Sequence, residues 1–247
     1  MNDIIKSLTI SDILKSTYVK MHKLIWITIY VSAVCTLQLS MAGCADERGW
    51  SKAESAIINE ASAPMRVLTV NNPADSTVLR TPCTDLTPEM LASPEYAKLA
   101  SLMVATVTDP SEDGVGIAGP QVGISRRIVA VQRFDKPGEP FEVYPNIRII
   151  AVRGELCSGP EGCLSVPGRR GNVLRYRDID IKYSLVPKSA TGLDGSTETT
   201  AGSRTSEGAG AVRDTVERIQ GFTAVIFQHE CDHLDGVLYT DKLSDTP

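Results

Sequence analysis

Histidine is scarce in this sequence, and cysteines in closely spaced pairs are lacking. The 247 residues hold only three histidines, His22, His229 and His233. None of the six cysteines belongs to a Cys-x-x-Cys pair, and their irregular spacing argues against a disulfide framework. Basic residues are not in excess either, since the formal net charge is -5 at pH 7. That balance excludes a general nucleic-acid-binding protein, because little positive charge is available to displace counterions from phosphates.

The composition that remains is that of a globular protein. Apolar residues make up 42% of the chain, enough for a sizeable core, and charged residues make up an ordinary 22%. The length suits one domain with extensions, or at most two small domains.

An apolar run near the N-terminus predicts a targeting segment. A short basic stretch at residues 22–23 precedes an apolar run over residues 24–42, and Cys44 follows two small residues. This is the layout of a secretory signal. The sequence Met-Ala-Gly-Cys at residues 41–44 also resembles the lipobox of bacterial lipoproteins, in which the cysteine is lipidated. We therefore expect residues 1–44 to export the chain as a membrane-anchored lipoprotein.

The same segment is compatible with different roles. The apolar run is almost long enough to span a bilayer, so an uncleaved anchor is one alternative. An organellar presequence is another. Met21 is a cleaner start for a signal than Met1, and a start near Met65 would give a cytoplasmic protein.

Three further regions follow the signal segment. Residues 45–64 are polar and rich in small side chains, and we expect a flexible tether. Residues 65–247 are expected to form the main folded domain. Within it, residues 187–213 are dense in Ser, Thr, Gly and Ala without periodicity, which predicts a flexible insertion.

Helices and strands in the domain are predicted from caps and periodicity. Ser93-Pro94-Glu95 is a strong helix start, and apolar residues recur at helical spacing after it. Short buried strands are expected at residues 128–131 and 147–152, and an alternating, half-buried strand at residues 179–185. Because helices and strands do not alternate strictly, we predict an α+β fold with mixed or antiparallel sheets around a C-terminal helix. A closing strand is expected at residues 237–239.

That C-terminal helix carries the pattern HExxH. His229 and His233 are four residues apart, so on a helix they share one face and can bind one metal ion. Glu230 stands beside the first histidine, where it can reach a water molecule on that metal. A buried helix with two incidental histidines is the alternative. Against it, both histidines outside the signal region fall within the motif.

A catalytic metal site with one open position needs a third protein ligand. No histidine follows His233, which excludes the extended metzincin pattern. Any other Cys, Asp or Glu is a candidate. Cys163 offers a thiolate in the loop-like segment Glu161-Gly-Cys-Leu-Ser165, although a small buried residue is the commoner role of a single cysteine.

Three segments taken together resemble the peptide deformylase family. Gly114-Val-Gly-Ile-Ala-Gly-Pro-Gln121 is similar to its first motif, Glu161-Gly-Cys-Leu-Ser165 to its second and Gln228-His-Glu-Cys-Asp-His233 to its third. Their order and separations also fit. The family's first motif usually has Ala-Ala where this chain has Ala118-Gly119. We expect a looser loop there, because glycine removes a methyl contact and adds backbone freedom.

The resemblance implies a role for each matching residue. It implies metal binding by Cys163, His229 and His233, and general acid–base catalysis by Glu230. Oxyanion stabilisation is implied for the Gln121 side chain and the Leu164 backbone N–H. The resemblance further implies four substrate-binding residues: Gly116, Arg170, Phe222 and Val225.

The resemblance also implies a cofactor and a substrate. It implies one divalent metal per chain, iron(II) first, with zinc, nickel or cobalt as alternatives. The implied substrates are N-formyl-methionyl peptides, met on nascent chains at the ribosome if the protein is cytoplasmic. We expect a monomer. The rival hypotheses are another HExxH metallopeptidase and an exported metal-binding protein without catalysis.

Overall fold

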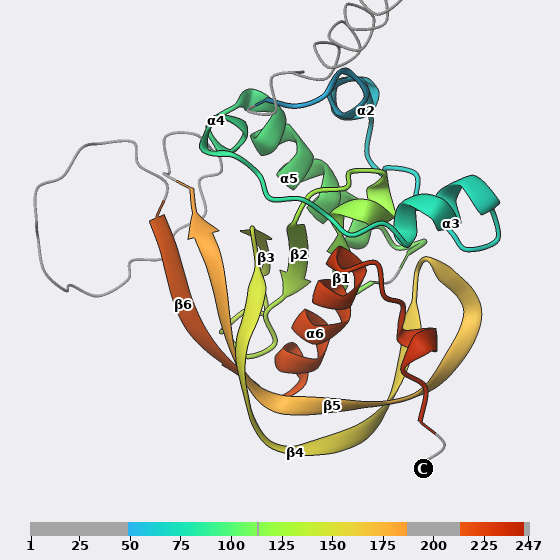
Figure 1. Cartoon of the computed structure of the whole chain (residues 1–247), viewed down its shortest axis with the longest axis vertical. Helices are drawn as coiled ribbons and strands as arrows, with labels where there is room; N and C mark the ends of the chain where they lie inside the picture. Colours follow the sequence, from blue (N-terminus) through green and yellow to red (C-terminus); the bar gives the residue numbers. More distant parts are fainter. Residues whose placement is uncertain (1–48, 113, 187–212, 245–247) are drawn as a thin grey trace, which may run out of the picture. The chain divides into compact units, whose positions relative to one another are not determined.

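The computed structural model describes residues 49–112, 114–186 and 213–244 (Figure 1). The predicted signal segment at residues 1–44 lies outside these ranges. So does the predicted insertion at residues 187–213, except Arg213, which begins a strand. Among the described helices, none combines the length and apolar character that crossing a membrane requires.

The structure describes five α-helices. They are α2 (Lys52–Glu60), α3 (Pro73–Leu79), α4 (Pro88–Leu91), α5 (Pro94–Val107) and α6 (Phe222–Leu234), with short 3-10 turns η1 (Gly119–Val122) and η3 (Tyr239–Asp241). In four of the helices, α2 to α5, the side chain of the preceding residue caps the first turn. As predicted, Ser93 caps α5: its hydroxyl accepts a hydrogen bond from the Tyr96 backbone N–H, and Pro94 occupies the first helical position. The expected closing strand at residues 237–239 is wrong, because Tyr239 begins η3 instead.

The strands form two antiparallel three-stranded sheets. The first contains β1 (Gly116–Ala118), β2 (Ile128–Gln132) and β3 (Phe141–Pro145), and the second contains β4 (Arg148–Cys163), β5 (Val166–Leu185) and β6 (Arg213–Gln220). The predicted α+β class with antiparallel sheets is confirmed. The strands expected at residues 147–152 and 179–185 are parts of β4 and β5, which are far longer than the sequence pattern indicated.

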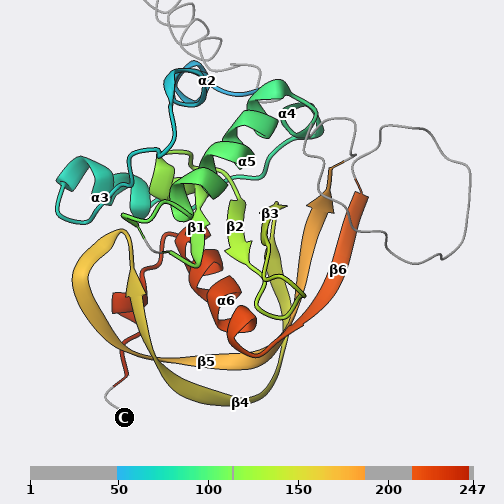
Figure 2. The same cartoon turned by 180° about the vertical axis from the view of Figure 1, so that it is seen from behind.

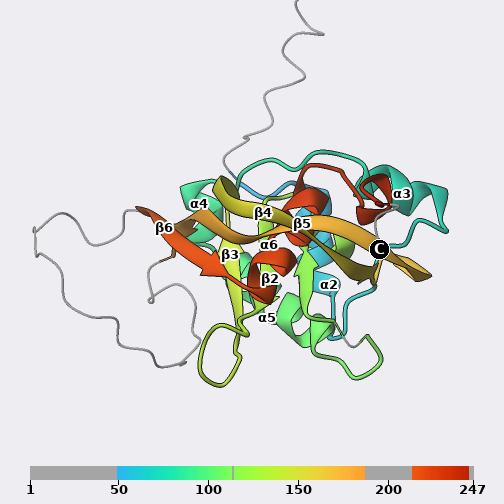
Figure 3. The same ribbon diagram turned by 90° about the horizontal axis from the view of Figure 1, so that it is seen from below.

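Helix α6 lies against strands of both sheets. It contacts β1 and β2 of the first sheet and β4, β5 and β6 of the second. In Figures 1 and 2 the long, curved β4 and β5 pass beneath α6, and Figure 3 shows them from below. Buried apolar side chains of α6, β2, β5 and β6 form one core cluster: Val129, Val131, Ile179, Ile181, Ile219, Ala224, Phe227 and Leu234. The helix is therefore held on several sides, which fixes the side chains that it carries.

The tether predicted for residues 45–64 is wrong for Lys52–Glu60, which form α2. Ser51 and Glu54 make a capping box at its start. Ile58 is fully buried in a core cluster with residues of α5. Glu54 accepts two hydrogen bonds from the Arg126 guanidinium, at 2.6 and 3.0 Å. Apolar burial and a bidentate ion pair thus make α2 part of the folded domain.

The looser loop expected at Gly119 is also not what the structure shows. Gly119 is buried in η1, and a Cβ atom there would lie 2.7 Å from each of two backbone carbonyl oxygens, those of Ile124 and Arg126. Contacts of that length with backbone atoms are repulsive. Glycine therefore permits the close packing of this turn, rather than loosening it.

Candidate active site

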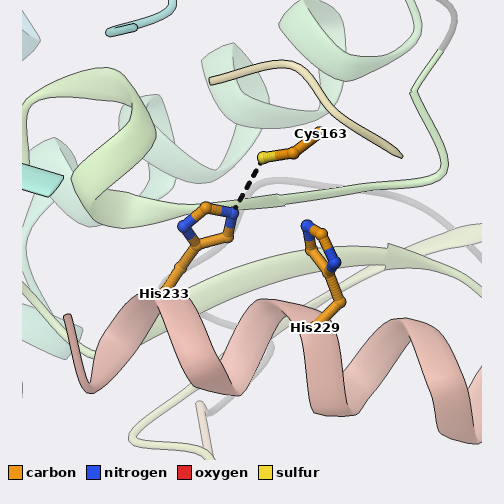
Figure 4. Close-up of side chains that lie close together, drawn as sticks. All are labelled: Cys163, His229 and His233. Atoms are coloured by element: carbon orange, nitrogen blue, oxygen red, sulfur yellow. Dashed lines mark hydrogen bonds between the residues drawn. The ribbon is translucent and has the colours of Figure 1, made fainter. Parts of the chain in front are cut away.

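A thiol and two imidazole rings converge between β4 and α6. Cys163 is the last residue of β4, and His229 and His233 lie one turn apart on α6 (Figure 4). The Sγ atom of Cys163 is 3.2 Å from Nε2 of His233. One donor atom from each of the three residues lies within 4.8 Å of the other two. Metal ions such as zinc bind nitrogen and sulfur at ~2.0–2.3 Å. Donor atoms bound to one such ion therefore lie at distances from one another similar to those seen here.

A buried carboxylate fixes the ring of His229. Nδ1 of His229 lies 2.9 Å from Oε2 of Glu161, which leaves Nε2 for another partner. Glu161 is itself held by two hydrogen bonds from the Arg175 guanidinium, at 2.8 and 3.0 Å. Arg175 also donates to Asp232 of α6, at 2.6 Å. Such a carboxylate–histidine contact is typical of metal sites, because it sets the tautomer and the orientation of the ring.

The electrostatics of this contact suit the binding of a cation. Burial opposes the charge on Glu161, but hydrogen bonds from His229 and Arg175 outweigh it and lower the pKa of Glu161 to about 2. Burial likewise opposes a charged His229, yet its contacts with Cys163 and Glu161 raise the ring pKa to about 10. The surroundings therefore favour positive charge at His229, whether it comes from a proton or from a metal ion.

Glu230 is a buried carboxyl group on α6, next in sequence to His229. Its Oε2 atom has no hydrogen-bond partner among the described residues. Burial raises its pKa to about 7, despite the opposing effect of His229. A Cβ atom on Gly116 would lie only 2.5 Å from Oε1 of Glu230, so glycine leaves the space that this carboxyl group fills. A carboxyl group that exchanges its proton near neutral pH is suited to general acid–base catalysis.

The amide of Gln121 is held in one orientation. Its Oε1 accepts a hydrogen bond from the Ala118 backbone N–H at 2.8 Å. Its Nε2 therefore faces Ser165, whose hydroxyl it reaches at 3.2 Å, and Cys163, whose sulfur is 3.7 Å away. The donor of Gln121 thus points toward the same place as the ligand atoms.

These groups line one cleft of about 870 Å³, a volume within the usual range for small-ligand sites. The structure brings nearly every predicted site residue to its wall: Gly116, Gln121, Cys163, Leu164, Arg170, Phe222, Val225, His229 and Glu230. The exception is His233, which is buried behind the wall in contact with Cys163.

Sequence reasoning missed three residues that form hydrogen bonds within the site. Glu161 belongs to the second motif but had no predicted role, and neither Arg175 nor Ser165 was predicted to take part in the site. A signal for Arg175 existed in the alternation of β5. Arg175 is an even number of residues away from the buried Val173, Ile179 and Ile181, so it lies on the same buried face of the strand. A charged residue there needs a partner.

The donor set fits a divalent metal ion. Thiolate sulfur and imidazole nitrogen are the ligands of zinc and of late first-row metals, and the site leaves room for a water molecule or a substrate. With a buried carboxyl group of raised pKa next to these donors, the fold and the site define a metal-dependent hydrolase. The comparison with protein families identifies a family of this class. The chain belongs to the polypeptide deformylase family, whose model matches residues 64–191 and 211–247.

Individual relatives support the assignment. A peptide deformylase of Leptospira biflexa is 34% identical over 74% of this chain and 90% of its own length. One from Symbiobacterium thermophilum is 37% identical over 56% of this chain, which covers only 51% of that relative. Among solved structures, a class I type b peptide deformylase from Acinetobacter baumannii is 31% identical, with a TM-score of 0.56, over 73% of this chain and 100% of that one.

We expect Glu161→Gln to weaken metal binding about 10- to 100-fold, the usual cost of losing a carboxylate that orients a ligand. The amide keeps the size of the side chain but removes the charge that faces His229 and Arg175. Titration with a competing chelator measures the change. Asp180→Asn is the matched control, since this carboxylate on β5 pairs with Arg153 away from the cleft. Unchanged affinity in Glu161→Gln would contradict the positioning role.

Proposed function

We propose that this protein is a peptide deformylase that hydrolyses the N-formyl group of formyl-methionyl peptides and releases formate. One observation carries the proposal: donor atoms of Cys163, His229 and His233 lie within 4.8 Å of one another, and Glu230 lines the same cleft. Family membership supplies the substrate class. A complex of the Acinetobacter baumannii relative with Met-Ala-Ser is consistent with peptide binding in such a cleft.

We propose that α6 is the metal-binding helix of the HExxH type about which both sheets are organised. Cys163, His229 and His233 are the proposed ligands of one divalent ion per chain. When bound, that ion supplies Lewis acidity that lowers the pKa of a water molecule toward ~7. Iron(II) is the proposed ion, with zinc, nickel or cobalt as substitutes that the same donors accept.

In the proposed reaction Glu230 moves the proton. Its carboxylate takes a proton from the attacking water, whose oxygen then bonds to the formyl carbon. Glu230 next delivers that proton to the amide nitrogen as the C–N bond breaks. A pKa near neutrality suits both steps, because the group must be a base first and an acid afterwards. The products are formate and a peptide with a free amino group.

Two donors are proposed to stabilise the oxygen that gains negative charge. The amide of Gln121 is one, because its carbonyl end is already occupied by Ala118 and its Nε2 faces the ligands. The backbone N–H of Leu164, in the turn after Cys163, is the other. A donor of this kind is typically worth about 2.7–4 kcal/mol in the transition state.

Other residues that line the cleft are proposed to bind the peptide. Phe222 and Val225, on the first turns of α6, offer apolar surface for the methionine side chain. Gly116 borders the channel, and Arg170 lies at the rim, where the peptide continues.

We also propose that residues 1–44 export the protein and that Cys44 carries a lipid anchor. The packing of α2 onto α5 supports a start upstream of residue 52, because a chain that begins near Met65 would lack Ile58 and the Glu54–Arg126 pair. Mass spectrometry of the native N-terminus tests this. A lipidated Cys44 supports export, whereas an N-terminus near Met65 contradicts it.

Formate release tests the function directly. The metal-loaded protein is incubated with formyl-Met-Ala-Ser and with its acetylated counterpart. The expected result is formate from the first peptide and no acetate from the second, because an acetyl group is larger at the reacting carbon. Cleavage of an internal peptide bond would favour a different metallopeptidase. Metal binding without any hydrolysis would favour a non-catalytic protein.

A further inference from the structure

The rim of the cleft is shaped by a break in the pairing of β4 and β5. Cys163 pairs with Val166, but the preceding residue, Gly162, pairs with Arg170. Residues 167–169 are therefore extra on the β5 side, and Gly168 has a positive φ of 73°. Bulges of this kind re-aim side chains and are frequent next to active sites. Here the bulge presents Arg169 and Arg170 at the wall of the cleft.

Arg169 and Arg170 are among the few arginines of the described ranges without an acidic partner. They are exposed, and neither guanidinium forms an ion pair with any carboxylate in the described ranges. Most other arginines of the described ranges are paired, among them Arg66 with Asp75, Arg126 with Glu54, Arg148 with Asp85, and Arg175 with Glu161 and Asp232. Arg177 is also unpaired within these ranges, but it does not line the cleft. Two free cations on the wall of a binding cleft are placed to meet an anion of the ligand.

The chemistry of the proposed substrate says where that anion would lie. A formylated N-terminus carries no positive charge, so the first charges of the peptide come from side chains or from a nearby C-terminal carboxylate. At about 870 Å³, the cleft is large enough to hold residues beyond the formylated one. Inside it, the charge of Glu161 is already matched by Arg175. Within the described ranges, the other acidic residues that line the cleft are Glu112 and Glu230. Glu230 is the proposed acid–base group, which leaves Glu112 as the carboxylate set against the two arginines.

We propose that Arg169 and Arg170 select formyl-peptides that carry a carboxylate within the two or three residues after the first. This inference rests on the proposed deformylase function. The carboxylate has two sources, an acidic side chain or the C-terminus of a short peptide. The two arginines recognise the same group in either case.

Five peptides of one length test the preference and separate the sources. Formyl-Met-Ala-Gln amide is the neutral reference. Formyl-Met-Ala-Glu amide adds a side-chain carboxylate, formyl-Met-Ala-Lys amide adds a cation, and formyl-Met-Ala-Ser as free acid and as amide differ only at the C-terminus. We expect kcat/KM to be about fivefold higher for the Glu peptide than for the Gln peptide, the scale of one exposed ion pair. A gain for the free acid over its amide identifies the C-terminus as a second source.

Substitutions test whether Arg169 and Arg170 cause the preference for a carboxylate. Arg169→Gln and Arg170→Gln should each reduce the ratio of kcat/KM between the Glu and Lys peptides, and the double variant should abolish it. Arg177→Gln is the matched control, because Arg177 is exposed on the same strand β5 but does not line the cleft. Raising the salt concentration from about 0.05 M to about 0.5 M should weaken the preference in the parent, since screening shortens the reach of exposed charges.

The outcomes separate this inference from the function on which it rests. Equal kcat/KM for the Glu, Gln and Lys peptides would overturn the charge preference while leaving deformylation intact. A preference for the Lys peptide would assign the dominant charge to Glu112 and would also overturn it. Failure to deformylate even the neutral Gln peptide would overturn the proposed function, and the inference with it.

Discussion

Replacement of Glu230 by glutamine is expected to lower kcat for formate release by about a hundredfold to ten-thousandfold while leaving the metal content unchanged. The amide has nearly the size of the carboxyl group, so it fits the space beside Gly116. It can neither accept a proton from water nor return one to the leaving nitrogen. Because Glu230 is not among the proposed ligands, the metal should stay bound.

Two measurements on the same preparation check this expectation. Steady-state formate release gives kcat, and elemental analysis gives the metal per chain. Glu89→Gln is the matched control: it makes the same change at an exposed carboxylate on α4, outside the cleft. Turnover in Glu230→Gln within tenfold of the parent would remove Glu230 from the acid–base role. Loss of metal would instead assign it to the coordination of the ion.

The second large effect is expected at Cys163. Cys163→Ala removes the only proposed sulfur ligand and leaves two imidazoles, so the metal content should fall well below one per chain after dialysis against a chelator. Activity should fall in the same proportion. The structural cost should be small, because Cys163 is only partly buried at the end of β4.

Cys157→Ala provides the comparison for this experiment. Cys157 lies on the same strand, is exposed, and is a free cysteine like Cys163. It should retain metal and activity at the parental level. If Cys163→Ala also retained stoichiometric metal through the dialysis, ligation by its sulfur would be refuted.

The helices show how far local sequence signals reach. The start of α5 was predictable because Ser93 caps it and Pro94 fits its first turn. The same kind of signal was present for α2, where Ser51 and Glu54 form a capping box. The polar, small-residue composition around it suggested a tether instead. What stabilises α2 is the burial of Ile58 against residues far along the chain, which composition does not reveal.

For the strands, the sequence predicted position better than length. Alternation correctly predicted a strand at residues 179–185, where Ile179 and Ile181 face the core. Much of β4 is exposed on both faces, and its pairing with β5 is interrupted by bulges, so no regular apolar period marks its length. Register across a long hairpin is a property of the pair of strands, and neither strand specifies it alone.

Some residues of the candidate site were predictable from local spacing, and others were not, because only the fold brings them together. Spacing four residues apart on a helix placed His229 and His233 together without further information. Cys163 and Gln121 required the resemblance, because they come from other elements that only the fold brings near. Glu161 and Arg175 were missed because their pairing crosses the β4–β5 hairpin. The groups that hold His229 and its neighbours in place are therefore the part of the candidate site that the sequence discloses least.

The proposed chemistry requires one metal ion bound by a sulfur and two imidazoles, next to a carboxylate that moves protons. Anomalous diffraction from crystals of the metal-loaded protein, recorded at the absorption edge of the metal, shows where such an ion lies. We expect one peak per chain, within bonding distance of Sγ of Cys163 and of Nε2 of both His229 and His233. A peak that lies away from the Cys163 sulfur, or that is coordinated by Glu230, would refute this chemistry.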